Sequence, residues 1–329
     1  MNNYTVSSRI RFARNLKEYP FGERMTSAQK KELCGKVKKA FFGANSSMKK
    51  EYDYIDLEKA DRIDLLSLAE TNKISPQFVS MKDSALILSK DGAVSIMINE
   101  EDHLRIQVIL PGLALKEAYE KAVLIEKLLS EKLQFAYSEK LGYLTACPTN
   151  LGTGMRASLM LHLPAISEAG AVNSLVNEAD KAGILVRGAN GEGSKAQGAL
   201  FQLSNRATLG VTEKEITERL TEVASQIVKQ EEKLFDKLKK AQGVVMEDKI
   251  MRAYGSLKYA RLLSADEFIS LYSLARMGVY LKLTDTKLDV LDKLYFSCRP
   301  ATVASNYGKD MSAHQRDIKR AQLCREALN

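Results

Sequence analysis

The amino-acid sequence predicts an α+β protein in which an antiparallel sheet flanked by helices is followed by an all-helical segment. Apolar runs at 85–89 and 93–98 are joined through Lys90-Asp91-Gly92, and Asp-Gly between such runs is a strong signal for a β-hairpin. Strand-like and helix-like runs then alternate along the chain, and beyond Gly243 only helical periodicity remains. These observations favour a two-domain chain.

The elements of the first domain, residues 1–242, follow from the spacing of apolar residues. After the hairpin, a strand at 103–110 should end at Pro111-Gly112, because proline and glycine interrupt regular structure. Period-2 or short apolar runs predict further strands at 52–57, 144–147, 157–163, 184–187 and 199–203. Helical spacing predicts helices at 26–42, 61–70, 115–133, 166–182 and 213–240.

The second domain, residues 243–329, contains only predicted helices. They cover 247–262, 265–280, 284–297 and 314–328. Ser264 and Thr284 each precede acidic residues, as N-caps with acidic first turns do, so we expect separate helices instead of one long rod.

Composition is that of an ordinary soluble protein. Of the 329 residues 45% are hydrophobic and 27% charged, and no apolar run approaches the roughly 18 residues of a membrane span. The N-terminal residues lack the apolar core of a secretory signal, so we expect a cytoplasmic protein with no membrane partner. The scattered cysteines Cys34, Cys147, Cys298 and Cys324, with three dispersed histidines, indicate reduced thiols and no resident metal site.

The net charge of +8 and the pI near 9.1 favour an anionic partner, either a nucleotide, a nucleic acid or a phosphorylated surface. The lysines are spread over helical faces, as in 229–240, which is typical of solvated surfaces. Nucleic acid is therefore the least favoured of the three.

Five arginines stand beside small residues in segments predicted to be loops, turns or strand ends. They are Arg9, Arg11, Arg105, Arg156 and Arg187. Guanidinium groups bind phosphate oxygens in a fork, so a cluster of them could hold a triphosphate without a P-loop, and no Walker sequence is present. Each arginine alone would more often be a surface ion-pair partner, so the prediction depends on all five together.

Acidic and thiol side chains form a second group of candidates. Glu100 and Glu101 follow an apolar strand, Glu192 lies in a glycine-rich segment, and Cys147 opens a turn that contains Gly152 and Gly154. Carboxylates could hold and deprotonate a cationic acceptor, and a thiol beside cations could have a lowered pKa. The alternatives are a polar strand end and a buried structural cysteine.

The turn Cys147-Pro-Thr-Asn-Leu-Gly-Thr-Gly154 closely resembles the active-site signature of the phosphagen (guanidino) kinases. Four further blocks match that family in the same order, at 7–11, 99–105, 187–192 and 204–210, so the resemblance spans roughly residues 4–232. It implies an antiparallel catalytic domain that phosphorylates a guanidino group with ATP and Mg²⁺.

Site roles implied by the resemblance are carried over by position. Glu101 would be the general base, Glu192 would orient the acceptor guanidinium, Cys147 would contact it as a thiolate, and Glu100 completes the catalytic set. Nucleotide binding is implied for Ser7, Ser8, Arg9, Ile10, Arg11, Asn72, Arg105, Arg156, Ala157, Ser158, Leu159, Met160, Arg187, Gly188, Ala189, Asn190 and Gly191. Asn72 replaces a family histidine, Asn190 a tyrosine and Lys195 an acidic residue, which affects the expected nucleotide and substrate preference.

The order of the domains resembles the bacterial protein-arginine kinase family. Kinases of free arginine or creatine carry a helical domain before the Ser-x-Arg-x-Arg block, whereas here that block begins at Ser7 and about ninety helical residues follow the kinase region. The resemblance implies phosphorylation of arginine side chains of proteins, which marks them for a Clp-type protease in stress regulation. It also implies a homodimer, a zinc-binding activator protein and a Clp ATPase as partners.

The segment Arg316-Asp-Ile-Lys-Arg-Ala321 resembles the phosphoarginine-binding regulatory motif of that family. The implied allosteric residues are Arg316, Asp317, Arg320 and Ala321. On a helix the two arginines stand four residues apart on one face and could hold a phosphate between them, although an ordinary charged helix has the same pattern.

Two other functions remain open at this point. The chain could phosphorylate a small guanidino compound such as free arginine with the same residues. It could also be a non-enzymatic protein that binds phosphoarginine or DNA, which the basic charge and the 316–321 motif would suit.

Overall fold

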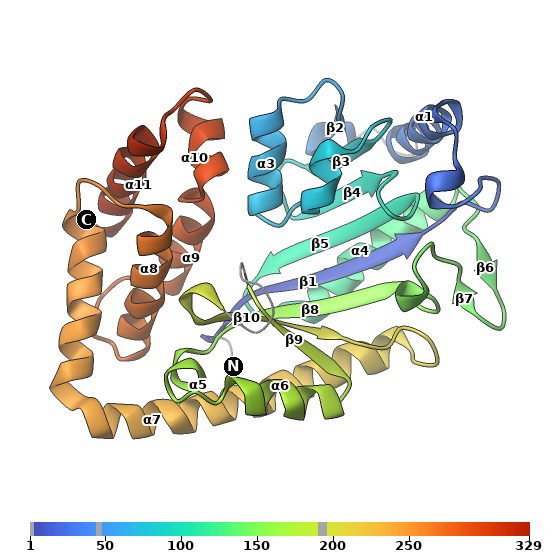
Figure 1. Ribbon diagram of the computed structural model, residues 1–329. Helices are drawn as coiled ribbons and strands as arrows, with labels where there is room; N and C mark the ends of the chain where they lie inside the picture. The colour runs from blue at the N-terminus through green and yellow to red at the C-terminus, as the bar shows by residue number, and fades with distance from the viewer. Residues whose placement is uncertain (1–2, 44–47, 190–195) are drawn as a thin grey trace.

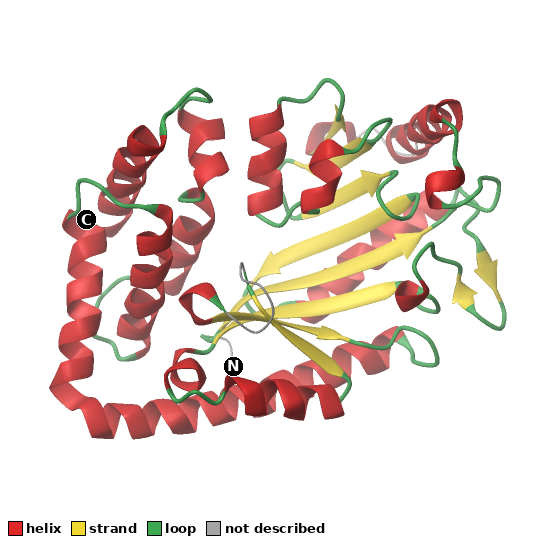
Figure 2. Cartoon of the chain, viewed as in Figure 1, coloured by secondary structure: helices red, strands yellow, loops and turns green. Residues whose placement is uncertain are grey.

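The computed structural model describes residues 3–43, 48–189 and 196–329 (Figure 1). An eight-stranded sheet in the order β2-β3-β4-β5-β1-β8-β10-β9 pairs antiparallel at every step. Helices flank the sheet, and a bundle of helices from the C-terminal third stands beside one end of it (Figure 2). The predicted α+β fold with a helical C-terminal region is confirmed.

The strands of the large sheet are β1 (Thr5–Arg14), β2 (Tyr52–Asp56), β3 (Ala85–Ser89), β4 (Val94–Ile98), β5 (Leu104–Pro111), β8 (Met155–His162), β9 (Ile184–Gly188) and β10 (Leu200–Asn205), and β6 (Tyr137–Ser138) and β7 (Gly142–Tyr143) form a separate hairpin. The helices are α1 (Ser27–Gly43), α2 (Met48–Glu51), α3 (Arg62–Glu70), α4 (Leu115–Ser130), α5 (Pro164–Glu168), α6 (Val172–Lys181), α7 (Glu213–Tyr259), α8 (Ala265–Tyr280), α9 (Leu288–Ser297), α10 (Pro300–Tyr307) and α11 (Ala313–Leu328). Short 3-10 turns are η1 (Gly22–Arg24), η2 (Pro76–Ser80), η3 (Pro148–Asn150) and η4 (Gln197–Ala199).

Strand β1 lies at the centre of the sheet between β5 and β8. The sequence analysis predicted no strand for these residues. Arg9 and Arg11 therefore lie within a central strand, not in a loop or at a strand end. The alternation Arg9-Ile10-Arg11-Phe12 carries the period-2 signal of a strand, but charged residues seldom occupy central positions unless that face serves a ligand.

The two faces of the sheet differ in chemistry. Ile10 and Phe12 of β1 are buried in a large apolar core with residues of α1, α4, α6 and the first half of α7, which cover this face. Arg9 and Arg11 alternate with them and lie on the opposite face, which we call the polar face. Helix α3 and the turn η2 pack on the β2–β4 side of that face through Leu86 and Met97.

Three local predictions are wrong and one helix was missed. Residues 144–147 form a loop leading into η3. The helix predicted at 166–182 is broken into α5 and α6, with Gly170 at φ 65° between them. Helix α9 begins after Lys287, so Thr284 is not its cap, whereas the predicted Ser264 cap accepts a bond from the Glu267 N–H. Helix α10 begins at Pro300, directly after Arg299, and its short apolar pattern was not recognised.

The C-terminal helices attach to the sheet through α7. The backbone of α7 leaves helical geometry at Gly243, where φ is 45° and ψ −121°, and the helix turns there from beneath the sheet toward the bundle (Figure 1). A second core joins α8, α9 and α11 to Met160 and Leu200 of the sheet. No described helix has the length and apolar character needed to cross a membrane.

The bundle also contacts α3. The Glu70 carboxylate, at the end of α3, accepts hydrogen bonds from the N–H groups of Ala301 (2.7 Å) and Thr302 (3.1 Å) at the start of α10. Lys309 Nζ lies 2.7 Å from the Asp64 carboxylate. The polar face is thus bordered by α3 on one side and by the bundle at one end.

Candidate active site

Register brings the predicted arginines together on the polar face. Arg11 lies opposite Arg156 across β1 and β8, and Arg9 lies opposite Ser158, whose Oγ is 3.2 Å from Arg9 Nε. Arg105 on β5 lies opposite Ala13, two residues along β1 from Arg11. Arg187 on β9 lies opposite Gln202 and is exposed. Because directly opposed residues share a face of a sheet, all five guanidinium groups emerge on one side.

Three arginines of the cluster have a lowered pKa, because of burial and then of the neighbouring positive charges. Burial, followed by the charges of Arg156 and Arg105, lowers the pKa of Arg9 to about 10. Burial and the neighbouring arginines also lower the pKa of Arg11 well below its ordinary value, and the pKa of Arg156 falls because of burial and the charges of Arg187 and Arg105. Arg9, Arg11, Arg105 and Arg156 are thus within electrostatic reach of one another, and Arg187 is within reach of Arg156.

Several donors of the cluster have no partner in the described part of the protein. The Nε atoms of Arg11 and Arg156 are buried without a hydrogen-bond acceptor. Buried donors normally have partners, and guanidinium groups without facing carboxylates are suited to an anion with several oxygens. The residues present therefore fit the polyphosphate of a nucleotide.

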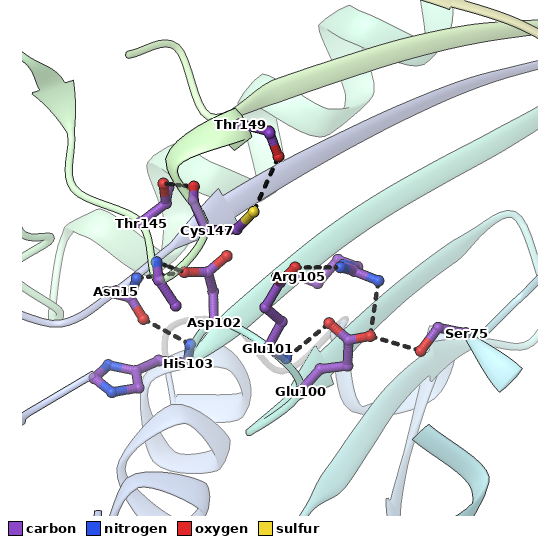
Figure 3. A network of polar contacts seen from close by, with 11 residues as sticks. Asn15, Ser75, Glu100, Glu101, Asp102, His103, Arg105, Thr145, Cys147 and Thr149 are labelled. Carbon is purple, nitrogen blue, oxygen red and sulfur yellow. Dashed lines mark hydrogen bonds and ion pairs between the residues drawn. The ribbon is translucent and has the colours of Figure 1, made fainter. Parts of the chain in front are cut away.

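A carboxylate pair closes one end of the cluster. Arg105 donates to Glu100 (2.8 Å) and to Glu101 (3.3 Å), but the two carboxylates differ in exposure. Glu100 is 5% exposed and also accepts from Ser75 Oγ at 2.6 Å and from the Glu101 N–H at 2.8 Å. Glu101 is 43% exposed, and among the described residues its carboxylate contacts only Arg105, at 3.3 Å, so it remains available to a cationic ligand (Figure 3).

A buried network holds the carboxylate loop against the cysteine loop. The Asp102 carboxylate accepts from Asn15 Nδ2 at 2.6 Å and from the Ala146 N–H at 2.7 Å. Asn15 accepts in turn from the His103 N–H at 2.8 Å, which ties both loops to the end of β1 (Figure 3). Cys147 is half-buried on the second loop, with its Sγ 3.0 Å from Thr149 Oγ1. Glu101 and Cys147 are thus fixed beside the same end of the polar face.

A cavity of about 950 Å³ opens at this end and is lined by both carboxylates. Its other walls come from the turn around η1, including Tyr19, Phe21 and Arg24, from α1, from residues 81–83, from Asn99 and from residues 145–146. A Cβ built on Gly22 of this turn would lie 3.8 Å from the Glu101 carbonyl oxygen, which shows how closely the turn approaches the carboxylate loop. The cavity offers a route for a cationic side chain to reach Glu101.

The remaining residues predicted to bind nucleotide fall into two groups. Ser7, Asn72, Ser158 and Met160 line one narrow cavity together with Arg9. Alternation turns the side chains of Ser8, Ile10, Ala157 and Leu159 to the opposite, apolar face, which excludes a side-chain contact with a ligand on the polar face. Ser8 Oγ instead donates to the Gly112 carbonyl and accepts from the Ala114 N–H.

The Arg187 block is described only in part. Gly188 ends β9, and the Ala189 N–H donates to the Leu200 carbonyl at 2.8 Å. Asn190, Gly191, Glu192 and Lys195 lie outside the described residues. The predicted role of Glu192 therefore stays a prediction.

The 316–321 motif lies on α11, far along the chain from the arginine cluster, and its two arginines differ. Arg320 is buried and donates through Nε to the Cys298 carbonyl (2.7 Å) and through Nη1 to the Leu263 carbonyl (2.8 Å) and to Asp317. Arg316 is half-buried and donates to the Met311 carbonyl at 2.6 Å. Ala321 is fully buried in the bundle core. Phosphoarginine binding by this motif stays a prediction, and Arg320 has a structural role beside it.

Sequence reasoning missed the polar residues that position the site. Ser75 donates a hydrogen bond to Glu100, and Asn15 with Asp102 joins the loop that carries Glu101 to the loop that carries Cys147. Ser204 accepts from Arg156 Nη2 at 3.1 Å. Asp102 and Ser204 lie within the matched blocks at 99–105 and 204–210, but single polar residues give no signal of their partners. In the described residues no group of three or more His, Cys, Asp or Glu side chains is arranged to hold a metal ion.

Comparison with known proteins agrees with this geometry. Residues 32–234 match the family ATP:guanido phosphotransferase, C-terminal catalytic domain, and residues 232–329 match the family Protein-arginine kinase McsB C-terminal domain. The protein-arginine kinase of Caldanaerobacter subterraneus subsp. tengcongensis is 42% identical over 98% of this chain and 96% of its own length. The protein-arginine kinase of Clostridium acetobutylicum is 41% identical over 99% and 96%, respectively.

Solved structures share the fold at lower identity. A lombricine kinase superposes with a TM-score of 0.62 at 24% identity, covering 71% of this chain and 68% of its own. The duplicated taurocyamine kinase of Schistosoma mansoni, with bound transition state analog components, gives a TM-score of 0.63 at 21% identity, covering 95% of this chain and 41% of its own. With two relatives above 40% identity over nearly the whole chain and a catalytic-domain match over most of it, this chain belongs to the protein-arginine kinase family and is a kinase with the guanidino-kinase fold.

Proposed function

We propose that the protein transfers the γ-phosphoryl group of ATP to arginine side chains of other proteins. The observation that carries the proposal is the arrangement of five arginines, two of them with unpartnered buried Nε atoms, beside one open carboxylate, Glu101. The cations suit a triphosphate and the carboxylate suits a guanidinium acceptor. The printed names of the full-length relatives support a protein as the carrier of that guanidinium.

The order of side chains along β1 supports a direction for the reactants. Arg105 and Glu101 stand near Ala13, Arg11 with Arg156 follows, and Arg9 with Ser158 comes next. Successive same-face positions on a strand are separated by roughly 6–7 Å. The γ-phosphoryl group would then lie at the Arg105 end, within reach of an acceptor that enters through the cavity of about 950 Å³.

In the chemical step the phosphoryl group passes directly from ATP to the acceptor, without a covalent bond to the protein. A guanidino nitrogen of the acceptor attacks the γ-phosphorus, the bond from that phosphorus to the β,γ-bridging oxygen breaks, and ADP leaves with the bond electrons. The proton lost by the attacking nitrogen passes to the Glu101 carboxylate, because a protonated guanidinium is a poor nucleophile. The arginines stabilise negative charge on the phosphoryl oxygens and hold the reactants in line, which is the main source of rate in phosphoryl transfer. Magnesium bound with ATP would neutralise further phosphate charge.

Glu100 and Asp102 act in this scheme by positioning. Glu100 fixes the Arg105 guanidinium and the backbone of Glu101, and Asp102 fixes the loop that carries Cys147. Cys147 is proposed to contact the acceptor guanidinium as a thiolate, opposite Glu101.

The test is a transfer assay with MgATP and three acceptors: an arginine-rich protein, the same protein with every arginine replaced by lysine, and free arginine. Acid-labile phosphate should appear on the first acceptor only, and mass spectrometry should assign it to arginine. Turnover of free arginine without labelling of the protein would instead identify a kinase of a small guanidino compound. Absence of transfer to every acceptor, with ATP still bound, would favour a binding protein.

The resemblance to the family extends the proposal to partners. We propose a homodimer, stimulation by a zinc-binding activator protein, and delivery of the phosphorylated proteins to a Clp ATPase during stress. Comparing phosphoarginine-containing proteins, under acid-free conditions, in cells with and without this chain would identify its targets.

A further inference from the structure

A narrow cavity at the far end of the polar face is shared between the sheet and the C-terminal bundle. Ser7, Arg9 and Met160 line it from the sheet, Asn72 lines it from the segment after α3, and Phe296 of α9 closes it. Phe296 is half-buried, and it is the residue through which the bundle reaches the cavity. No site residue was predicted on α9.

The position of this cavity follows from the order of side chains along β1. The acceptor end of the polar face lies at Glu101 and Arg105, and the arginines continue from there to Arg9. Ser7, one same-face step beyond Arg9, borders the cavity. If the γ-phosphoryl group lies at the acceptor end, the base of the nucleotide must lie at the opposite end, beside Phe296. The inference therefore rests on the proposed function.

The surroundings of Phe296 connect its ring to the core of the bundle. Its ring packs edge-on against Tyr295, with centroids 5.0 Å apart, and Tyr295 is fully buried against Tyr272 of α8. Three residues further along, Arg299 precedes α10, whose first N–H groups are bound by Glu70. Glu70 lies only two residues before Asn72, so the two walls of the cavity are connected to each other by this contact.

The cavity is too small for a base as it stands. Its volume is about 20 Å³, enough for roughly one water molecule, whereas sites for small ligands usually measure about 300–1,000 Å³. A purine could enter only if Phe296 and the end of α9 move away from the sheet. A half-buried aromatic ring beside Met160 offers the apolar surface and π-face that a base requires.

We propose that Phe296 forms the outer wall of the nucleotide-base site, so that the C-terminal bundle takes part directly in ATP binding. Its side chain contacts the base and not the phosphates, which the arginines hold. Phe296 is thus a specificity-determining residue of the kinase on a domain that does not carry the catalytic groups.

The test compares nucleotide binding by the full-length wild type, Phe296→Ala, Phe296→Leu and the control Leu323→Ala. Leu323 is also partly buried against the bundle core but does not line the cavity. Calorimetric titration with ATP should show weaker binding by roughly five- to tenfold for Phe296→Ala, the size expected for loss of one aromatic contact, and by less for Phe296→Leu. Inorganic tripolyphosphate, which has no base, should bind wild type and variants equally.

Each result decides the inference. Weakened ATP binding with unchanged tripolyphosphate binding, and an unaffected Leu323→Ala control, would support a base contact. Equal loss for both ligands, a loss also in Leu323→Ala, or unchanged or tighter ATP binding by Phe296→Ala would overturn it. Since these measurements need no acceptor, they remain separate from the transfer assay that tests the proposed function.

Discussion

Glu100 and Glu101 are neighbours in sequence with different surroundings. Glu100 is 5% exposed and accepts hydrogen bonds from Arg105 and Ser75, whereas Glu101 is 43% exposed and faces the acceptor cavity. A general base must meet its substrate and must be free of stronger partners. In the proposed mechanism this difference favours Glu101 as the reacting carboxylate and Glu100 as a positioning one, although their chemistry is the same.

Glu101→Gln should lower kcat by about 10²–10⁴-fold, the usual contribution of general acid–base catalysis. The Kd for ATP should change less than about threefold, because Glu101 contacts the phosphate-binding arginines only at 3.3 Å. Steady-state kinetics and calorimetry on the same samples would check this. A kcat within a few-fold of the wild type would remove Glu101 from the reaction.

Glu100→Gln is the matched variant and should behave differently. Loss of the charge that fixes Arg105 should raise the KM for ATP, with a smaller effect on kcat than that of Glu101→Gln. If both variants showed the same kcat defect with unchanged KM, the division of roles would be wrong.

The arginine cluster should cost stability while it supports binding. Arg11→Met removes a half-buried cation that has a buried Nε without a described partner and repelling neighbours, so the free energy of unfolding without nucleotide should rise by about 1–2 kcal/mol. Stabilisation by added ATP should largely disappear. Thermal unfolding with and without MgATP would show both effects, with Arg206→Met, an exposed arginine on the surface, as the control. A destabilised Arg11→Met that still responded to ATP would contradict this account.

At the scale of elements, the sequence predicted most helices and strands but not the central strand. The period-2 alternation of β1 was not recognised because charged arginines stand at every second position, and charged residues are uncommon in a central strand. The strand predicted at 144–147 failed because its short apolar run packs as a loop held by Asp102, a contact 44 residues distant that local pattern cannot contain. Helix α10 was missed because its cap is supplied by Glu70, which lies 231 residues away.

Helix α7 carries a buried carboxylate that titrates near neutrality. Glu231 is fully buried and binds the N–H groups of Ala165 (2.7 Å) and Ile166 (2.8 Å) at the start of α5. Burial raises the pKa of Glu231 to about 7, despite these two hydrogen bonds, which lower it.

The pH dependence of stability follows from that shift. Between the ordinary glutamate pKa and about 7 the folded state binds more protons than the unfolded state, so this group makes stability fall as pH rises through that window. The effect is on the order of 3 kcal/mol at most. Glu231→Gln should reduce the change of melting temperature between pH 5 and 7.5. The substitution Glu232→Gln, at the exposed neighbouring residue, should leave that change as in the wild type. Identical pH profiles for all three proteins would show that Glu231 does not titrate there.

At the scale of the whole molecule, the sequence predicted the blocks of the site and the order of the domains but not how they meet. The arginines and Glu101 were found because their blocks match a family in order, and register then explained why they converge. The contacts of the bundle with α3 and with Met160 join residues that no local pattern relates. Phe296 and Asn72, which line the same cavity, are another such pair that the sequence did not predict.

Attachment of the bundle to α3 should depend on Glu70. Glu70→Ala removes the acceptor for two N–H groups of α10, a loss comparable to that of a helix cap, about 1 kcal/mol. Hydrogen exchange of residues 300–307 should become faster while that of β1 stays unchanged. Glu117→Ala, on the exposed side of α4, serves as control. Unaltered exchange in α10 would show that other contacts hold the bundle in place.

Clustered guanidinium groups have a practical consequence for anyone who assays this protein. A site that sets five guanidinium groups beside only two described carboxylates, Glu100 and Glu101, attracts multivalent oxyanions, so sulfate or phosphate buffers should compete with ATP. Dissolved salt also screens the attraction that draws the nucleotide in. Apparent affinities should therefore fall steeply with ionic strength, and measurements from different buffers will be comparable only when their anions are matched.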